Sequence, residues 1–324
     1  MKTKFLYYPL LLVLFSTCTK SPEQSEEKLV HVNAVKVQRV CKTYEVFMEQ
    51  LKADPSLQQK MDEIENFTQR YIKDPAAYRL LADGTLELPV VVNVLYNTAE
   101  QNISDRQIKS QIDVLNEDFA ATNRDLNSTS TYNSVKSGDI KIKFVLQQVV
   151  RKYTTVTAFS TNNAMKKANR GGIDATSPET TLNIWSCNMG GGILGYAQFP
   201  GGNIATDGIV LNTLAFGKGN SFNLYQDYDL GRTATHEVGH YFNLRHIWGD
   251  RKCGNDYVED TPLHETYNFG CPAANKISIC DGGIEMTMNY MDYTDDACMY
   301  MFTKKQALRM QATFAAGGPR ETLR

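Results

Sequence analysis

Apolar residues follow a helical period in the N-terminal part of the chain. Between Tyr44 and Tyr71 they recur three or four positions apart, as on one face of a helix. Pro55 divides this stretch into two predicted helices, with Asp54 as a cap and Pro55 in the first turn of the second. Residues 18–85 are therefore expected to form a tether and a small helical segment, separate from the rest of the chain.

Short apolar runs rich in β-branched residues predict the strands of a sheet further along the chain. The predicted strands are Leu88–Tyr96, Ile140–Val149, Thr181–Trp185 and Asp207–Asn212. A helix capped by Ser104 lies between the first two, and its apolar stripe is Ile108, Ile112, Leu115 and Phe119. Lys304–Phe314 is predicted to be a final helix. This order of elements predicts a sheet with one backing helix.

Composition is that of an ordinary globular protein. The 324 residues are 42% hydrophobic and carry a net charge of −2 at pH 7. Nothing in this balance indicates a nucleic acid or an anionic membrane as partner. No internal stretch of about 18 apolar residues is present, so no membrane span is expected. The length suggests one large or two modest domains.

The first residues have the pattern of an export signal. Lys2 and Lys4 precede the apolar run Phe5–Phe15, which is too short to span a bilayer. Residues 1–17 are therefore predicted to be a signal peptide. Small residues just before Cys18 resemble a bacterial lipoprotein cleavage site, which implies a lipid anchor on Cys18 at the cell envelope. The alternative is a plain secretory signal with an incidental cysteine.

Three histidines and one glutamate form the strongest chemical motif. His236 and His240 lie four residues apart, so a helix presents both imidazoles on one face, and Glu237 lies beside the first. His246 comes six residues later, and a continuous helix would turn it about 240° away. Asn243 tolerates the left-handed conformation that would end the helix and bring His246 back. Three ligands with a fourth position open predict a catalytic Zn²⁺ site, at which Glu237 accepts a proton from water.

This motif resembles the zinc segment of the metzincins, with Asn243 where glycine is usual. Residues 289–293 resemble the methionine-containing turn of that group, with Met291 as a packing floor beneath the metal. The surrounding sequence is more specifically similar to the pappalysin family, including ulilysin-like bacterial peptidases. The matching stretches are residues 195–200, the zinc segment, Glu259–Pro262 and Met291–Cys298. The resemblance covers roughly residues 86–315.

The resemblance implies an α+β fold of the metzincin type for residues 86–324. Its upper part (86–246) would hold a twisted mixed sheet, a backing helix and the zinc helix, and its lower part (247–324) would be rich in loops. Within Gly190–Ala197, the resemblance implies an exposed edge strand that pairs with an extended peptide through Gly192, Ile193 and Leu194. A plain glycine turn is the alternative.

Arg39–Thr43 resembles the Arg-x-Cys-Gly-Thr segment of pappalysin-like zymogens, with Lys42 in place of glycine. The resemblance implies that the Cys41 thiolate occupies the open zinc position and keeps the enzyme latent. Alternatives are a buried structural cysteine or a disulfide between Cys41 and Cys187. Tyr78–Arg79 lies between this segment and the first strand, and we expect the activating cut there.

Four cysteines follow the zinc segment, and an exported protein favours disulfides between them. They are Cys253, Cys271, Cys280 and Cys298, and the sequence alone allows three pairings. The resemblance implies Cys253–Cys280 and Cys271–Cys298. A structural zinc held by all four thiolates is the alternative.

The resemblance also implies roles for single residues. Tyr293 would stabilise the oxyanion, and Asp296 would lie at the base of a pocket that favours Arg or Lys after the cut. Asp256, Asp260 and Thr261 offer hard oxygens for Ca²⁺, although a solvated acidic loop would have the same sequence.

The function predicted from these features is that of an exported, monomeric zinc endopeptidase that acts on peptide or protein substrates. Two alternatives remain open. A catalytically silent peptide-binding module would keep the cleft but usually lose Glu237. A zinc peptidase of another group would take a glutamate such as Glu259 as third ligand in place of His246.

Overall fold

The computed structural model describes residues 1–2, 37–78, 85–126 and 131–323. The predicted signal, Cys18 and Arg79 lie outside these residues. The chain divides into two units, Met1–His31 and Val32–Arg324, and every element below belongs to the second. Within the described ranges, no helix has both the length and the apolar character needed to cross a bilayer.

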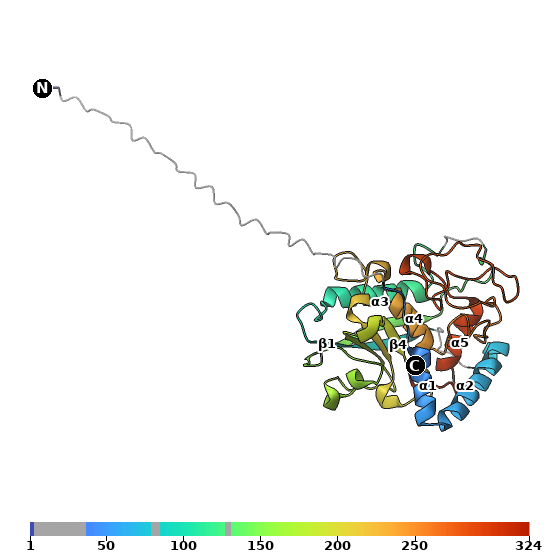
Figure 1. The fold of residues 1–324 in the computed structure, drawn as a ribbon. Helices are drawn as coiled ribbons and strands as arrows, with labels where there is room; N and C mark the ends of the chain where they lie inside the picture. Colours follow the sequence, from blue (N-terminus) through green and yellow to red (C-terminus); the bar gives the residue numbers. More distant parts are fainter. Residues whose placement is uncertain (3–36, 79–84, 127–130, 324) are drawn as a thin grey trace. The chain divides into compact units, whose positions relative to one another are not determined.

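A five-stranded mixed sheet forms the centre of this unit (Figure 1). Its strands are β1 (Leu86–Tyr96), β2 (Ile142–Tyr153), β3 (Leu182–Cys187), β4 (Gly195–Ala197) and β5 (Ile209–Asn212). They are arranged in the order β2-β1-β3-β5-β4. The β1–β2, β1–β3 and β3–β5 pairs are parallel, whereas β4 pairs antiparallel with β5. The predicted α+β class is confirmed, and β4 is an edge strand of the sheet.

Alternating side chains give the sheet two buried faces. Ile184 and Leu211 belong to the main core, which α3 (Asp105–Phe119) and α4 (Arg232–Tyr241) share. Trp185 on the opposite face belongs to a second core. Two-sided burial explains why these strands read as nearly continuous apolar runs.

Element boundaries agree with the predicted ones to within two residues except at two strands. β2 continues to Tyr153, because its pairing with β1 extends that far. The strand expected over Gly190–Ala197 begins at Gly195, so the first half of that prediction is wrong. Gly190–Gly192 instead forms a 3-10 turn. Gly191 and Gly192 have φ values of 70° and 73°, which an extended strand excludes.

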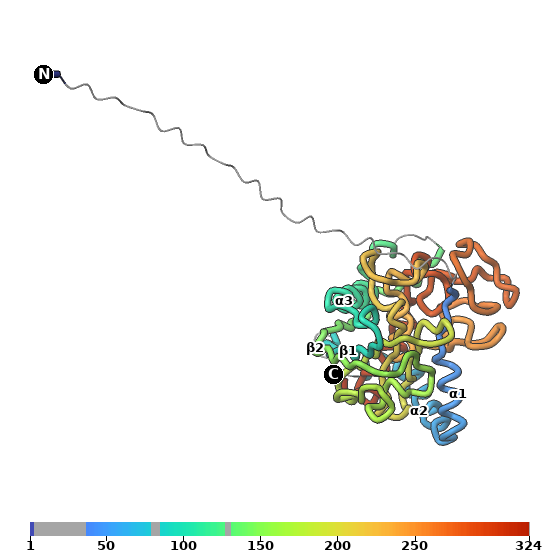
Figure 2. The backbone as a smooth tube through the Cα atoms, turned by 60° about the vertical axis from the view of Figure 1, so that its left-hand side comes forward, coloured from blue at the N-terminus to red at the C-terminus, as the bar shows by residue number. Residues whose placement is uncertain are grey.

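The N-terminal segment forms a hairpin of two helices, α1 (Thr43–Ala53) and α2 (Ser56–Lys73), as Figure 2 shows. Pro55 separates them, and the Asp54 carboxylate accepts a hydrogen bond from the Ser56 N–H at 3.0 Å. Helix α2 packs against α5 (Lys304–Phe314), the last long helix. The predicted helices are therefore present, and they pack on the end of the chain.

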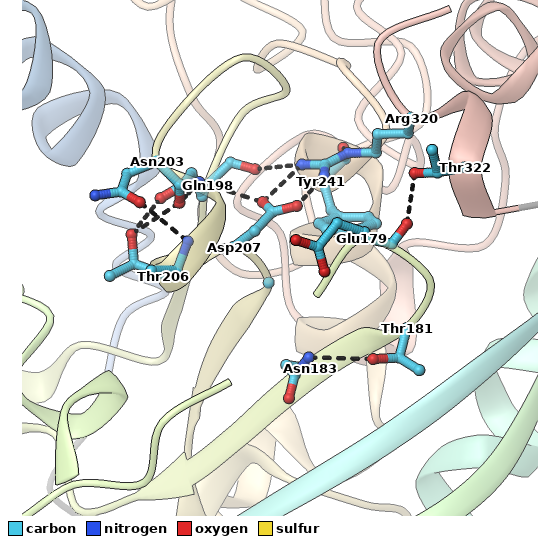
Figure 3. Close-up of polar contacts among 12 residues, drawn as sticks. Glu179, Thr181, Asn183, Gln198, Asn203, Thr206, Asp207, Tyr241, Arg320 and Thr322 are labelled. Carbon is cyan, nitrogen blue, oxygen red and sulfur yellow. Dashed lines mark hydrogen bonds and ion pairs between the residues drawn. The ribbon is translucent and has the colours of Figure 1, made fainter. Parts of the chain in front are cut away.

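Arg320 fastens the C-terminal segment to the upper part of the fold (Figure 3). Its guanidinium contacts the Asp207 carboxylate and donates to the carbonyls of Tyr241 and Gln198 at 3.0 and 3.2 Å. Tyr241 ends α4, so this buried arginine supports the C-terminal end of the helix that carries His236 and His240.

Two disulfides stabilise the lower, loop-rich part. They join Cys253 to Cys280 and Cys271 to Cys298, the pairing that the resemblance implied. A zinc site built from these four thiolates is therefore wrong. Cys41 and Cys187 are both free and buried, so a disulfide between them is also wrong.

Candidate metal centre and substrate cleft

Three imidazoles converge at the C-terminal end of α4. His236 and His240 leave one face of the helix, and their Nε2 atoms lie 3.2 Å apart. Asn243 takes the left-handed conformation at φ 70°, which ends the helix and turns the chain back. His246 thereby returns, and its Nε2 lies 3.1 Å from that of His240. The predicted bend at Asn243 is present.

Each imidazole is held by a partner on its other nitrogen. The Nδ1 atoms of His236 and His240 lie 2.7 Å from the carbonyls of Tyr290 and Leu244, and the Nδ1 of His246 contacts the Asp250 carboxylate. These contacts direct the three Nε2 lone pairs inward. Burial lowers the pKa of His236 and His240 well below the ordinary value, which keeps both rings in the neutral form that binds metals.

Cys41 adds a sulfur to the three nitrogens. The four ligand atoms lie within 4.8 Å of one another, and all four residues are buried. Burial, together with the negative charge of Glu237, raises the pKa of the Cys41 thiol well above its usual value. A bound cation would reverse that preference and favour the thiolate. Three imidazoles and a thiolate are a donor set that suits Zn²⁺, so these residues fit the metal.

Glu237 faces the N-terminal segment. Its Oε2 accepts a hydrogen bond from Thr43 Oγ1 at 3.0 Å and lies 3.5 Å from Cys41 Sγ. Burial raises the pKa of Glu237 to about 8. Gly195 in β4 lies so close that a Cβ there would be 3.0 Å from the Glu237 side chain. The strand therefore sets the position of this carboxylate.

Tyr293 closes the opposite side of the site. Its hydroxyl donates to the Cys41 carbonyl at 3.0 Å, and its ring lies 5.8 and 5.0 Å from the rings of His236 and His246. Burial raises the pKa of Tyr293 well above its ordinary value, so the hydroxyl stays protonated and remains a donor. A donor beside the imidazoles thus already binds a peptide carbonyl.

The N-terminal segment pairs with the edge of β4 that no other strand occupies. Cys41 and Gly195 form a parallel bridge, in which the Lys42 N–H donates to the Gly195 carbonyl at 3.1 Å. The Leu194 N–H donates to the Val40 carbonyl at 3.0 Å. Leu194 therefore contacts an extended segment through its backbone, whereas Gly192 lies in the preceding turn and Ile193 caps that turn.

Asp296 forms a buried ion pair with Arg39. Its Oδ1 accepts from Arg39 Nη2 at 2.6 Å, and both side chains are 1% exposed. Its Oδ2 accepts from the backbone N–H groups of Leu230 and Arg232 at 3.0 and 3.1 Å. Arg39 also lies over the Tyr228 ring. The Asp296 carboxylate and the Tyr228 ring thus both stabilise the buried guanidinium of Arg39.

The residues predicted for calcium do not share one set of contacts. Asp256 accepts a hydrogen bond from Thr261 Oγ1 at 2.9 Å. Asp260 instead accepts from Thr303 Oγ1 and from the Lys305 N–H at the start of α5. Calcium at these residues stays a prediction. Glu259 pairs with Lys305 on the surface, away from the three histidines.

Met291 packs against α4, and its role as a floor beneath the metal stays a prediction. A Cβ on Gly239 would come within 2.5 Å of the Met291 sulfur, so these two residues touch. The Tyr290 carbonyl in the same turn holds His236.

Sequence reasoning missed three residues at this site: Thr43, Gly195 and Asp250. Gly195 belongs to the glycine-rich stretch for which an edge strand was predicted, but its contact with Glu237 was not predicted. The Thr43 hydroxyl bonds both Glu237 and the Ala197 N–H, at 3.0 and 2.8 Å. Asp250 lies four residues after His246, a spacing that would have signalled a partner for Nδ1.

The comparisons with known proteins agree with this geometry. A family model described as pregnancy-associated plasma protein-A, of peptidase family M43, matches residues 191–315. An extracellular metalloprotease of Verticillium alfalfae is 31% identical over 242 residues, which cover 70% of this chain and 78% of that protein.

Two solved structures from Tannerella forsythia are also similar. Mature mirolysin in complex with a cleaved peptide is 44% identical with a TM-score of 0.71, over 74% of this chain and 95% of that one. A promirolysin mutant is 42% identical with a TM-score of 0.78, over 88% of this chain and 97% of that one.

Fold and site together define a zinc metallopeptidase of the metzincin class. The chain belongs to the pappalysin family, peptidase family M43.

Proposed function

We propose that the chain is an exported zinc endopeptidase made in a latent form, with zinc held by His236, His240 and His246. The observation that carries this proposal is the convergence of three oriented Nε2 atoms beside Glu237. When bound there, zinc acts as a Lewis acid that polarises a carbonyl and makes water more acidic. In the latent form, Cys41 Sγ supplies the fourth ligand. We refer to residues 18–85 as the pro-segment.

Glu237 is proposed as the general base, which accepts the proton of the attacking water and later delivers it to the leaving amine. In the latent form, Thr43 bonds this carboxylate and Cys41 lies against it, so the pro-segment occupies the base as well as the metal position. Glu237 is kept in a dry setting where its pKa is about 8, and water that enters after release would lower that value.

Tyr293 is proposed to stabilise the oxyanion. Its contact with the Cys41 carbonyl supports this role, because a scissile peptide also presents a carbonyl oxygen. Removing one such donor costs about 3–4 kcal/mol in comparable enzymes. The edge of β4 that residues 40–42 now occupy is proposed to bind the substrate backbone after the pro-segment leaves, and the present pairing supports this.

Cleavage before Arg or Lys is proposed from the pocket of Asp296. Arg39 fills it with a buried guanidinium, the same group that a substrate arginine would bring. Arg satisfies such a site better than Lys, because its planar fork can also lie against Tyr228. We expect Arg to be preferred over Lys.

A peptide-library digestion tests the proposal directly. We expect cleavage before Arg and Lys by the processed enzyme, and its loss on chelation. Glu237→Gln should abolish cleavage, by about 10²–10⁴-fold, while zinc content stays unchanged. A variant that still cleaves peptides would reject Glu237 as the base. Equal cleavage after metal removal would reject the zinc mechanism.

The same variants separate the rival functions. A peptide-binding module would be unaffected by Glu237→Gln, because it needs no base. For the third ligand, His246→Ala should lose zinc and Glu259→Ala should retain it. The exposed side chain of Glu259 and its pairing with Lys305 support His246.

Four finer points belong to the same proposal. Cys18 is proposed as a lipid anchor, so Cys18→Ser should release the protein from membranes. The activating cut is proposed at Tyr78–Arg79, and N-terminal sequencing of the processed enzyme tests it. Calcium is proposed at Asp256 and Thr261, with Asp260 nearby in sequence. A monomer is proposed, and light scattering would reveal any larger assembly.

A further inference from the structure

Arg309 in α5 is a buried cation outside the groups discussed so far. Its side chain is 1% exposed. Its Nε donates to the Asn243 carbonyl at 2.8 Å, and its Nη1 and Nη2 bond both carboxylate oxygens of Glu65 at 3.0 and 2.5 Å. Arg309 therefore links the turn after α4 to pro-segment helix α2.

The Asn243 carbonyl lies at a critical position for the metal centre. Asn243 is the left-handed residue that ends α4 and redirects the chain. The next carbonyl, that of Leu244, holds His240, and His246 follows two residues later. Carbonyls at the end of a helix lack partners within the helix and favour a nearby cation. Arg309 supplies that cation and fixes the turn from which two imidazoles are oriented.

Helix α2 holds the same turn from two sides. Glu65 fixes the Arg309 guanidinium, and Thr68 accepts a hydrogen bond from the Asn243 side chain at 3.5 Å. Thr68 is fully buried and Asn243 is 2% exposed, so the contact between these two residues is shielded from water, whereas the Glu65 side chain is 26% exposed. The pro-segment therefore reaches the metal centre by a second route, separate from the Cys41 thiol.

We propose that Arg309 is a positioning residue for the metal centre, and that helix α2 strengthens zinc binding through Glu65, Arg309 and the turn at Asn243. This inference rests on the proposed zinc role of His240 and His246. Coupling of this kind is reciprocal, so bound zinc also strengthens docking of α2. Partners that orient metal ligands contribute about 10–100-fold to metal affinity, which sets the size of the effect expected for Arg309.

The test uses a full-length parent chain carrying Cys41→Ala and Glu237→Gln. The first change removes the direct thiolate ligand, and the second prevents self-cleavage. The rate of zinc loss from the zinc-loaded protein to a chromogenic chelator is then compared among variants. We expect Arg309→Met to lose zinc about 10–100-fold faster, and Glu65→Gln to lose it several-fold faster.

Glu63→Gln is the matched control, because Glu63 lies on the same helix, is exposed and contacts Gln59. It should lose zinc at the rate of the parent. The rise in Tm on adding zinc should also shrink in Arg309→Met and Glu65→Gln, which a merely structural role would not change.

Two results would overturn the inference in distinguishable ways. If the parent binds zinc and both variants retain it at the parent rate, the positioning role is wrong and the proposed function stands. The positioning role is also wrong if the Tm of Arg309→Met and Glu65→Gln falls by the same amount with and without zinc. If His246→Ala in the parent leaves zinc binding unchanged, the proposed function fails and the inference fails with it.

Discussion

The two ends of the described part of the pro-segment, residues 37–78, contact the rest of the enzyme by different physical means. At one end, residues 39–43 place a guanidinium, a thiol and a hydroxyl against Asp296, the three histidines and Glu237. Each polar group meets a chemically matched partner in a buried site. If residues 39–43 block the cleft as proposed, they do so with few residues and with polar contacts that are all buried.

Helix α2 at the other end docks mainly through apolar side chains. The buried ones are Leu57, Met61, Ile64 and Tyr71. Phe199 packs with the first three, whereas Tyr71 packs with Ala312 and Ala315. Apolar burial of this kind is additive and unspecific, at about 25 cal/mol per Å². We therefore predict that residues 39–43 provide inhibition and that α2 provides retention.

Arg39→Met should give the largest effect, because it leaves the Asp296 carboxylate buried without its cation. Losing one partner of a buried ion pair costs about 3–5 kcal/mol. We expect the unfolding free energy of the latent chain to fall by that amount, measured by urea titration in a Glu237→Gln background. With Glu237 intact, the unprocessed chain should also show proteolysis.

Lys42→Met is the control, since the Lys42–Glu45 pair at 2.6 Å lies on the surface, with Lys42 32% and Glu45 52% exposed. It should change stability by less than about 1 kcal/mol. If Arg39→Met and Lys42→Met lower the unfolding free energy equally, the buried Arg39–Asp296 pair contributes no more than an ordinary surface pair.

Met61→Ala tests the docking end. Met61 is 5% exposed, and its truncation should cost about 2–3 kcal/mol of unfolding free energy, because the cavity that it leaves can collapse in part. Calorimetry of the latent chain measures this. The intact chain should remain inactive, since residues 39–43 still occupy the cleft.

Met48→Ala is the matched control, because Met48 is 45% exposed. It should leave the Tm unchanged. If unprocessed Met61→Ala shows as much proteolysis as unprocessed Arg39→Met, the proposed division between inhibition by residues 39–43 and retention by α2 is wrong.

The sequence predicted the docking end and the upper part of the fold well, because both depend on periodic burial. The apolar spacing of Leu57, Met61 and Ile64 in α2 fixes which face packs, whatever lies opposite. The zinc segment and the turn at Asn243 were predictable because both are encoded locally, whereas the fold class was implied by the family resemblance.

The contacts of single polar groups were not predictable in the same way. Thr43 meets Glu237 across 194 positions, and Arg309 meets Asn243 across 66. Such pairs depend on the final placement of separate elements, which local spacing does not encode. The strand expected from Gly190 failed for a related reason, since positive φ at Gly191 and Gly192 favours a turn that a run of glycines leaves open.

Gly195→Ala should lower the catalytic rate by displacing Glu237. A Cβ at Gly195 would lie 2.8 Å from the Val210 carbonyl and 3.0 Å from the Glu237 side chain, so the carboxylate must move. A displacement near 1 Å costs up to about 100-fold in rate. In the processed enzyme we expect kcat to fall by about 10–100-fold with KM nearly unchanged.

Gly138→Ala serves as control, because nothing lies within 4 Å of a Cβ at that position. Full activity in Gly195→Ala would show that the strand does not set the position of Glu237.

The last prediction concerns pH, at Asp256, whose stability change is small per pH unit. Burial raises the pKa of Asp256 to about 7, although hydrogen bonds from Thr261 and the charge of Arg309 act in the opposite direction. The folded chain therefore binds this proton more tightly than the unfolded chain. Its contribution to stability is complete below about pH 4 and is lost as the pH rises through about 7, with a slope of at most about 1.4 kcal/mol per pH unit.

Asp256→Asn should remove that slope from urea titrations performed in chelator. Bound calcium would favour the ionised carboxylate, so added calcium should flatten the slope between about pH 4 and pH 7 in the parent and have no effect in Asp256→Asn. An unchanged slope in the presence of calcium would reject Asp256 as a ligand.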